Sequence, residues 1–271
     1  MNGLILPFTF PFMADAAMIA VIVAIPAALL SCFLVLKGWA LMGDGISHAV
    51  LPGIVLAYAM GLPLLVGAFA AGMICALSSG WLDANSRIKP DTALGVVMAG
   101  MFAVGLILFT VFPPGVHLDH ILFGNILGVG AQDFLQAIPI AAIVSLVLLM
   151  KWRDFALLAF DPVQARVSGL ATGWLHYGML AMVAAAVVAM MSAVGIILAV
   201  GLLIAPGAIA FLLTRRLAVM LILSITIAVS AAIAGIWTSF WLDSAPAPTI
   251  IVILTAAFIL TLVWHQWRGR A

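Results

Sequence analysis

Asp44 and His48 are the side chains in this sequence best suited to binding a metal ion. They stand four residues apart, so on a helix they would share one face. Carboxylate oxygen and imidazole nitrogen both coordinate divalent transition metals. Both residues also lie between long apolar runs, and ionisable groups inside a membrane segment are costly and usually functional. The pair therefore predicts a metal site inside a membrane.

Two structural explanations compete with the metal site. Asp44 lies between two glycines, and this pattern is also typical of an aspartate that caps the start of a helix. His48 could instead be a core histidine bonded to a carbonyl group, with Ser47 as its neighbour. A helix cap would explain Asp44 alone and would leave His48 unexplained.

The composition is that of an integral membrane protein. Hydrophobic residues make up 67% of the chain and charged residues only 7%, whereas a soluble domain is about 25% charged. The two cysteines, Cys32 and Cys75, both fall in apolar runs, so neither a disulfide framework nor a thiolate metal cage is expected. We expect residues 1–271 to form a single transmembrane domain.

Apolar runs of about 20 residues are long enough to cross a bilayer as a helix. The sequence contains nine such runs, at about 14–36, 41–60, 62–82, 92–112, 134–151, 174–192, 194–213, 217–241 and 248–266. The predicted fold is thus an all-α polytopic membrane protein with about nine spans. Eight spans, with one segment merged or re-entrant, is the alternative.

The distribution of basic residues predicts the orientation. With nine spans and the N-terminus outside, all ten Lys and Arg residues fall on the cytoplasmic side, together with the C-terminus. The outer side then carries acids and no basic residues, which favours the approach of cations, although ordinary insertion bias would give the same asymmetry. On that side His117, Asp119 and His120 form a loop cluster that either guides a metal ion or is an ordinary solvated loop.

The longest cytoplasmic segment between two spans covers about 154–170. Asp161 followed by Pro162 is typical of a helix N-cap and first helical residue. This predicts a short helix from Pro162 to Ser168 that ends at Gly169. The segment is either a docking element for a cytoplasmic partner or an interfacial connector.

Five motifs occur in an order and spacing that resemble a known family. They are GDGISHAVLPG at 43–53, DTALG at 91–95, LFGNILG at 122–128, FDP at 160–162 and LLIAP at 202–206. Together they resemble the manganese/zinc/iron permeases of ATP-binding-cassette importers, the ABC-3 type, over about 12–265. The loop at 117–120 is most similar to the manganese and chelated-iron branch.

The resemblance implies a fold like that of type II importers and a complex of several chains in the bacterial plasma (inner) membrane. It would comprise a second permease subunit, identical or different, two cytoplasmic ATP-binding subunits and an extracytoplasmic solute-binding protein. The transported ion would be Mn²⁺ or Fe²⁺, with Zn²⁺ as a further candidate, and neither a permanent cofactor nor nucleic acid is expected. By resemblance, the ATPase contacts would come from Asp161, Pro162, Gln164, Ala165, Arg166 and Gly169.

The chain itself is not expected to be an enzyme. It contains no Gly-x-x-x-x-Gly-Lys-Ser/Thr loop, so a nucleotide site must lie on another chain. If the second span starts near Ala40 at the cytoplasmic edge, Asp44 and His48 lie roughly 6 Å and 12 Å into the membrane. A twofold dimer would bring together two aspartates and two histidines. The alternative function is a proton-coupled secondary carrier or channel for divalent cations, in which Asp44 would relay protons.

Overall fold

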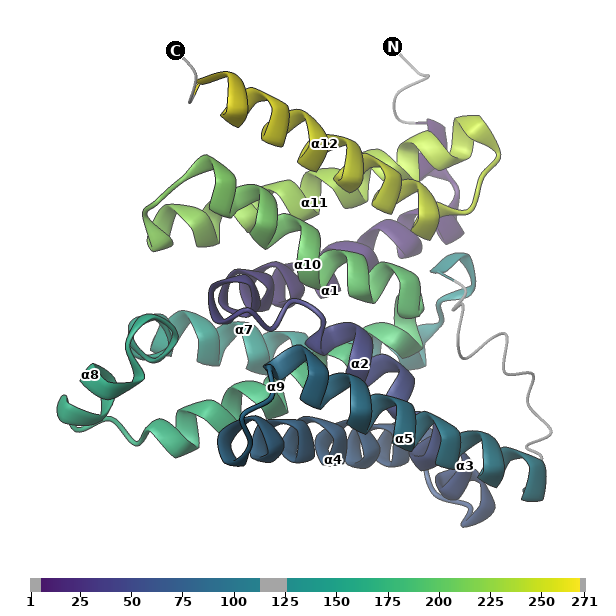
Figure 1. The fold of residues 1–271 in the computed structure, drawn as a ribbon. Helices are drawn as coiled ribbons and strands as arrows, with labels where there is room; N and C mark the ends of the chain where they lie inside the picture. Colours follow the sequence, from purple (N-terminus) through teal and green to yellow (C-terminus); the bar gives the residue numbers. More distant parts are fainter. Residues whose placement is uncertain (1–5, 113–125, 269–271) are drawn as a thin grey trace.

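The protein is described here by a computed structural model that covers residues 6–112 and 126–268. In this part of the chain the elements are helices without a single strand, as predicted (Figure 1). The α-helices are α1 (Pro11–Lys37), α2 (Met42–Ala49), α3 (Leu51–Ala59), α4 (Leu64–Asn85), α5 (Pro90–Val111), α7 (Ala131–Phe160), α8 (Pro162–Val167), α9 (Thr172–Val194), α10 (Ile196–Leu213), α11 (Leu217–Leu242) and α12 (Pro246–Arg268). Two short 3₁₀ helices cover Leu6–Thr9 and Ile126–Gly128.

Eight helices among the described residues are long and apolar enough to cross a membrane, and they match eight of the nine predicted spans. They are α1, α4, α5, α7, α9, α10, α11 and α12. The ninth predicted span, 41–60, forms the two short helices α2 and α3 instead. Pro52 explains the break, because it has no N–H to donate to the carbonyl of His48 one turn earlier. The helix that carries the Asp44/His48 pair therefore ends just after the histidine.

Helix α7 is longer than its predicted span of 134–151, because it continues to Phe160. The predicted cytoplasmic segment 154–170 thus begins as a helix. Phe155 and Leu158 are buried and extend the packed side of α7, while Lys151 and Asp154 form an ion pair of 3.2 Å one turn apart. Periodic apolar residues and this pair keep the chain helical beyond the apolar run.

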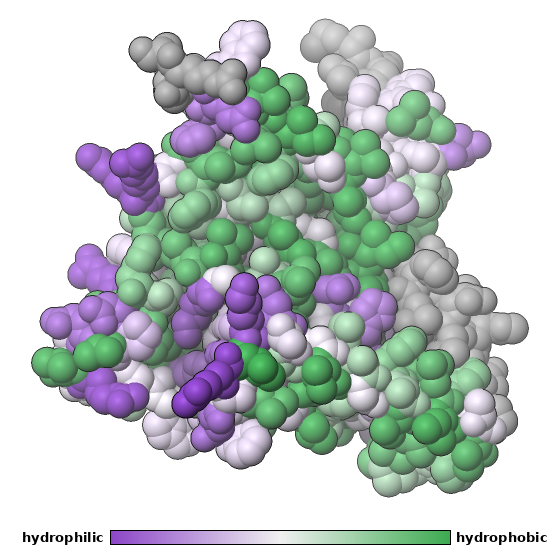
Figure 2. All heavy atoms as spheres, in the orientation of Figure 1, coloured by the Kyte–Doolittle hydropathy of each residue, from purple (hydrophilic) through white to green (hydrophobic). Residues whose placement is uncertain are grey.

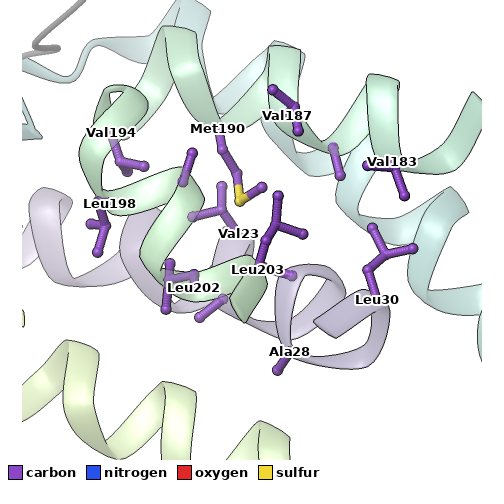
Figure 3. Packing of buried hydrophobic residues seen from close by; sticks show 14 of the residues in the cluster. Val23, Ala28, Leu30, Val183, Val187, Met190, Val194, Leu198, Leu202 and Leu203 are labelled. Carbon is purple, nitrogen blue, oxygen red and sulfur yellow. The ribbon is translucent and has the colours of Figure 1, made fainter. Parts of the chain in front are cut away.

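The core of the bundle is built around α1. This helix packs against α10 and α11 on one side and against α7 and α9 on the other (Figure 1). Figure 3 shows the centre of this core, where Met190 of α9 points toward Val23 of α1 beside Leu203 of α10. Because 72% of the apolar window of α1 is buried, this helix is shielded from lipid by its neighbours.

Much of the face seen in Figure 2 is apolar, and hydrophilic residues gather at the edge that carries α8 and in the lower middle of this face. Helices α5 and α12 are the least covered spans, with only 11% of each apolar window buried. An apolar helix face that remains uncovered in a membrane protein faces lipid or another membrane helix. Helix α5 is important below because it also borders the Asp44/His48 pair.

Helices α3 and α4 approach so closely that their backbones touch. A Cβ atom added to Gly53 would overlap the carbonyl oxygen of Gly67, and one added to Gly67 would overlap the carbonyl oxygen of Gly53. The chain reverses between the two helices at Gly61, whose φ of +68° is a conformation that suits glycine. Small residues of this kind allow close packing of membrane helices.

We predict that Gly53→Ala destabilises the protein, because the new methyl group meets backbone atoms that cannot rotate away. The expected loss is at least about 1–3 kcal/mol, the usual cost of overpacking, and appears as a lower midpoint of thermal unfolding in detergent. Gly178→Ala is the matched control, since a Cβ there has no atom within 4 Å. Equal midpoints for the two variants would contradict the close α3–α4 contact.

Candidate metal site

Asp44 and His48 lie on one face of α2, as the spacing predicts. His48 Nε2 and Asp44 Oδ1 are 3.6 Å apart, and the two side chains are 41% and 40% exposed. This distance is too long for a hydrogen bond. It suits two ligands of one ion, because ligand atoms about 2.1 Å from a tetrahedral metal lie roughly 3.4 Å from each other. The geometry would therefore allow both groups to bind the same ion.

The structure does not support the two competing explanations. The N-cap residue of α2 is Leu41, and no side chain caps this helix; Asp44 lies within its first turn. His48 is not a core residue, because its side chain is 41% exposed. Its ring meets the edge of Phe102 with centroids 5.9 Å apart. Neither residue is thus explained by capping or by a buried hydrogen bond.

The pair faces a hollow of about 460 Å³ with apolar walls. Asp44 and His48 are the ionisable residues of its lining, and the walls come from α5, α10 and α12: Phe102, Ile196, Ile197, Val200, Gly201 and Ile251. Apolar walls around a few convergent polar groups are typical of a small-ligand site. A cation here would have Asp44 and His48 as its side-chain ligands from this chain.

The glycines beside Asp44 allow α10 and α5, which supply walls of the hollow, to pack closely against α2. A Cβ on Gly43 would lie 2.7 Å from Leu203 Cδ1 of α10, and a Cβ on Gly45 would lie 2.7 Å from Leu94 Cδ1 of α5. Both leucines therefore pack directly against the backbone of α2. Larger residues at 43 or 45 would push α10 or α5 away from the face of α2 that carries Asp44 and His48.

The pair is incomplete as a metal site within one chain. Among the described residues no group of three or more His, Cys, Asp or Glu side chains could hold an ion. The predicted outer cluster of His117, Asp119 and His120 lies outside the described residues. The described part of the chain therefore supplies two side-chain ligands for an ion at Asp44 and His48.

The predicted helix after α7 is present as α8. Asp161 caps it as predicted, because its Oδ1 accepts hydrogen bonds from the N–H groups of Val163 at 3.0 Å and Gln164 at 2.9 Å. The helix ends at Val167, slightly before the predicted Ser168, and Gly169 follows with φ +80°. Ala165 is buried, whereas the other residues expected to contact an ATPase are exposed: Asp161, Pro162, Gln164, Arg166 and Gly169.

The structure adds exposed apolar residues that the sequence prediction missed. Val163 and Val167 are 73% and 77% exposed, and Phe160 beside them is 67% exposed. Two valines four residues apart on a predicted helix are a signal that could have identified this apolar face. The walls of the hollow were also missed. Their residues are ordinary apolar side chains, and no sequence signal distinguishes them from other positions in the spans.

Comparison with known proteins agrees with this architecture. The model of the ABC 3 transport family matches residues 9–265. The chelated iron transport system membrane protein YfeD of Yersinia pestis is 48% identical over 96% of this chain and 88% of its own length. The manganese transport system membrane protein MntB of Synechocystis sp. is 38% identical over 100% of this chain and 91% of its own length.

Two solved structures have the same fold. A chain in the structure of PsaBC from Streptococcus pneumoniae in complex with Fab has a TM-score of 0.82 and 34% identity, covering 93% of this chain and 91% of that one. An inward-facing, metal-chelate type ABC transporter has a TM-score of 0.69 at 16% identity, covering 92% and 85%, and shows the fold alone. With a family model that matches nearly its whole length, this multi-pass membrane protein belongs to the ABC 3 transport family.

Proposed function

We propose that the chain is the permease subunit of an ATP-driven importer of divalent transition metal ions, with Mn²⁺ or Fe²⁺ as the favoured cargo. The observation that carries this proposal is the Asp44/His48 pair, which faces an apolar hollow in a member of an ABC transport family. Its relatives are named as membrane proteins of manganese and chelated-iron transport systems, which supports these metals. No observation favours the proton-coupled carrier.

The permease would work as a pair of subunits, identical or homologous. The described residues of one chain offer two metal ligands here, and helix α5 beside them is largely uncovered. A twofold axis near this face would give one ion two carboxylates and two imidazoles. Such a ligand set binds Zn²⁺ more tightly than Mn²⁺ or Fe²⁺, so selectivity would depend on geometry and on delivery of the ion. Separation of the subunits would then weaken the site and release the ion.

We also propose that α2 and α3 together make the second of nine crossings. The N-terminus would then lie outside and the C-terminus in the cytoplasm, since this arrangement places every Lys and Arg on the cytoplasmic side. Helix α8 would lie on the same side, at the edge where hydrophilic residues gather (Figure 2). Breaks in a membrane helix are tolerated where the freed carbonyl lines a cavity.

The remaining partners follow from this arrangement. Cytoplasmic ATP-binding subunits would bind the exposed apolar face of α8 and hydrolyse ATP, and an extracytoplasmic binding protein would deliver the ion on the opposite side. The complex would reside in the bacterial inner membrane. Alternating access would move the ion past Asp44 and His48, and the ion would remain cargo rather than a resident cofactor.

We predict that Asp44→Ala and His48→Ala each lower Mn²⁺ and Fe²⁺ uptake by the assembled transporter at least about tenfold, the lower end of what loss of a supporting group costs a metal site. Uptake of Mn²⁺, Fe²⁺ and Zn²⁺ into proteoliposomes measures this. Because Asp44 caps no helix, the midpoint of thermal unfolding of the Asp44→Ala variant should stay close to that of the wild type.

His265→Ala is the control, because this histidine lies near the end of α12, outside the hollow. Its uptake should equal that of the wild type. Normal uptake by both the Asp44 and the His48 variants would refute the site.

We predict that Val163→Asp with Val167→Asp lowers co-purification of the ATP-binding subunit at least about tenfold, because a buried apolar contact is among the interactions that carry binding energy. Ser86→Asp, which adds a charge at the exposed turn after α4, is the control. If the double variant binds the ATPase as well as the control does, α8 is not the docking element.

A further inference from the structure

Helix α10 contains a proline, Pro206, and still continues as one helix from Ile196 to Leu213. Proline has no N–H, so the carbonyl of Leu202 one turn earlier loses its usual donor. Pro206 is buried. A polar group from a neighbouring helix can stabilise the backbone of such a turn.

Ser31 of α1 bonds to the backbone on both sides of Pro206, at Ile204 and Gly207. Its hydroxyl oxygen accepts a hydrogen bond from the N–H of Gly207 at 2.9 Å, and the hydroxyl donates to the carbonyl of Ile204 at 3.0 Å. Ser31 is completely buried. One side chain of α1 thus bridges the turn of α10 that contains Pro206.

The neighbouring glycine makes this bridge tight. A Cβ on Gly207 would lie 2.5 Å from both the carbonyl carbon and the Oγ of Ser31. The two helices therefore meet backbone to backbone at this point. Ser239 shows that such a bridge is not a general property of buried serines, because its described hydrogen bond goes to Ile236 within its own helix.

A movement of the bridged turn would reach the surroundings of the Asp44/His48 pair. The first half of α10 supplies Ile196, Ile197, Val200 and Gly201 to the wall of the hollow. Leu203, one turn before Pro206 and Gly207, packs against Gly43, the residue before Asp44. A change of angle at the turn would therefore move the wall of the hollow relative to the metal ligands.

We propose that Ser31 is a positioning residue for metal transport. Its hydroxyl holds the turn around Pro206 as a joint, and α10 bends at this joint when the permease changes between its outward-open and inward-open states. This role rests on the proposed function, because it assigns to the joint the movement of the wall beside Asp44 and His48. Proline in a helix is a common cause of such a bend.

The test compares Ser31→Ala with Ser239→Ala in the complete transporter, reconstituted with its ATP-binding subunits and binding protein. Removal of one partner of a buried hydrogen bond costs enough free energy to slow the change between the two states about tenfold. We expect Ser31→Ala to lower the maximal rate of Mn²⁺ uptake about tenfold. The Mn²⁺ concentration at half-maximal rate should change little, and Ser239→Ala should transport normally. Ser31→Cys, which is nearly isosteric and a weaker hydrogen-bonding group, should fall between wild type and Ser31→Ala.

A double-mutant cycle with Pro206→Ala distinguishes a joint at Pro206 from a role of Ser31 in helix packing alone. Alanine restores the N–H that pairs with the Leu202 carbonyl and removes the ring that weakens the turn, so a joint that depends on Pro206 predicts a smaller effect of Ser31→Ala in that background. The same cycle measured on the thermal midpoint gives a readout that does not need transport. Equal effects of Ser31→Ala in both backgrounds would overturn the joint.

The outcomes also separate this proposal from the proposed function. If Ser31→Ala transports like Ser239→Ala while Asp44→Ala is inactive, the joint is refuted and the metal path stands. If Asp44→Ala and His48→Ala both transport normally, the metal path is refuted, and the positioning role fails with it.

Discussion

Close approach of helices at small residues is the constraint on which this architecture depends. In a membrane the apolar side chains gain little by leaving lipid, so helices associate through tight packing and a few hydrogen bonds. Here Gly43 and Gly45 leave room for leucines of α10 and α5 to pack against α2, and Gly207 leaves room for Ser31 of α1. These contacts fix the positions of α5 and α10 relative to α2. They therefore also fix the apolar walls around Asp44 and His48. The candidate site consists of Asp44 and His48 among the described residues, and several glycines are needed to position the helices around them.

The break between α2 and α3 is a second consequence of local chemistry. Pro52 stands four residues after His48 and removes the donor that would otherwise pair with the carbonyl of that histidine. The pair consequently lies near the end of a short helix rather than in the middle of a long one. A helix end beside a hollow leaves room for movement, which suits a site that must release its ion as well as bind it.

The sequence predicted the parts of the structure that follow from local composition. Eight spans, the shared face of Asp44 and His48, and the cap at Asp161 depend on hydropathy, helical spacing and a single turn. The extension of α7 to Phe160 was missed, since charged residues at 151 and 154 look like the end of a span. The break at Pro52 was visible as a proline, but its effect depended on packing. The apolar walls of the hollow come from three helices distant in sequence, so only the tertiary arrangement reveals them.

The proposed pairing of subunits also links ion binding to assembly. In one chain the carboxylate of Asp44 is still 40% exposed and can be hydrated. Closing two such faces together would bring two carboxylates toward one axis and remove their water. Like charges without a counterion would repel, and their desolvation would be costly. A divalent cation between them removes both penalties, so the closed arrangement of the subunits would be stable only with the ion present. By the same linkage, separation of the faces would lower the affinity for the ion. In the proposed dimer, a site divided between two subunits would therefore allow the ion to be released when the subunits separate.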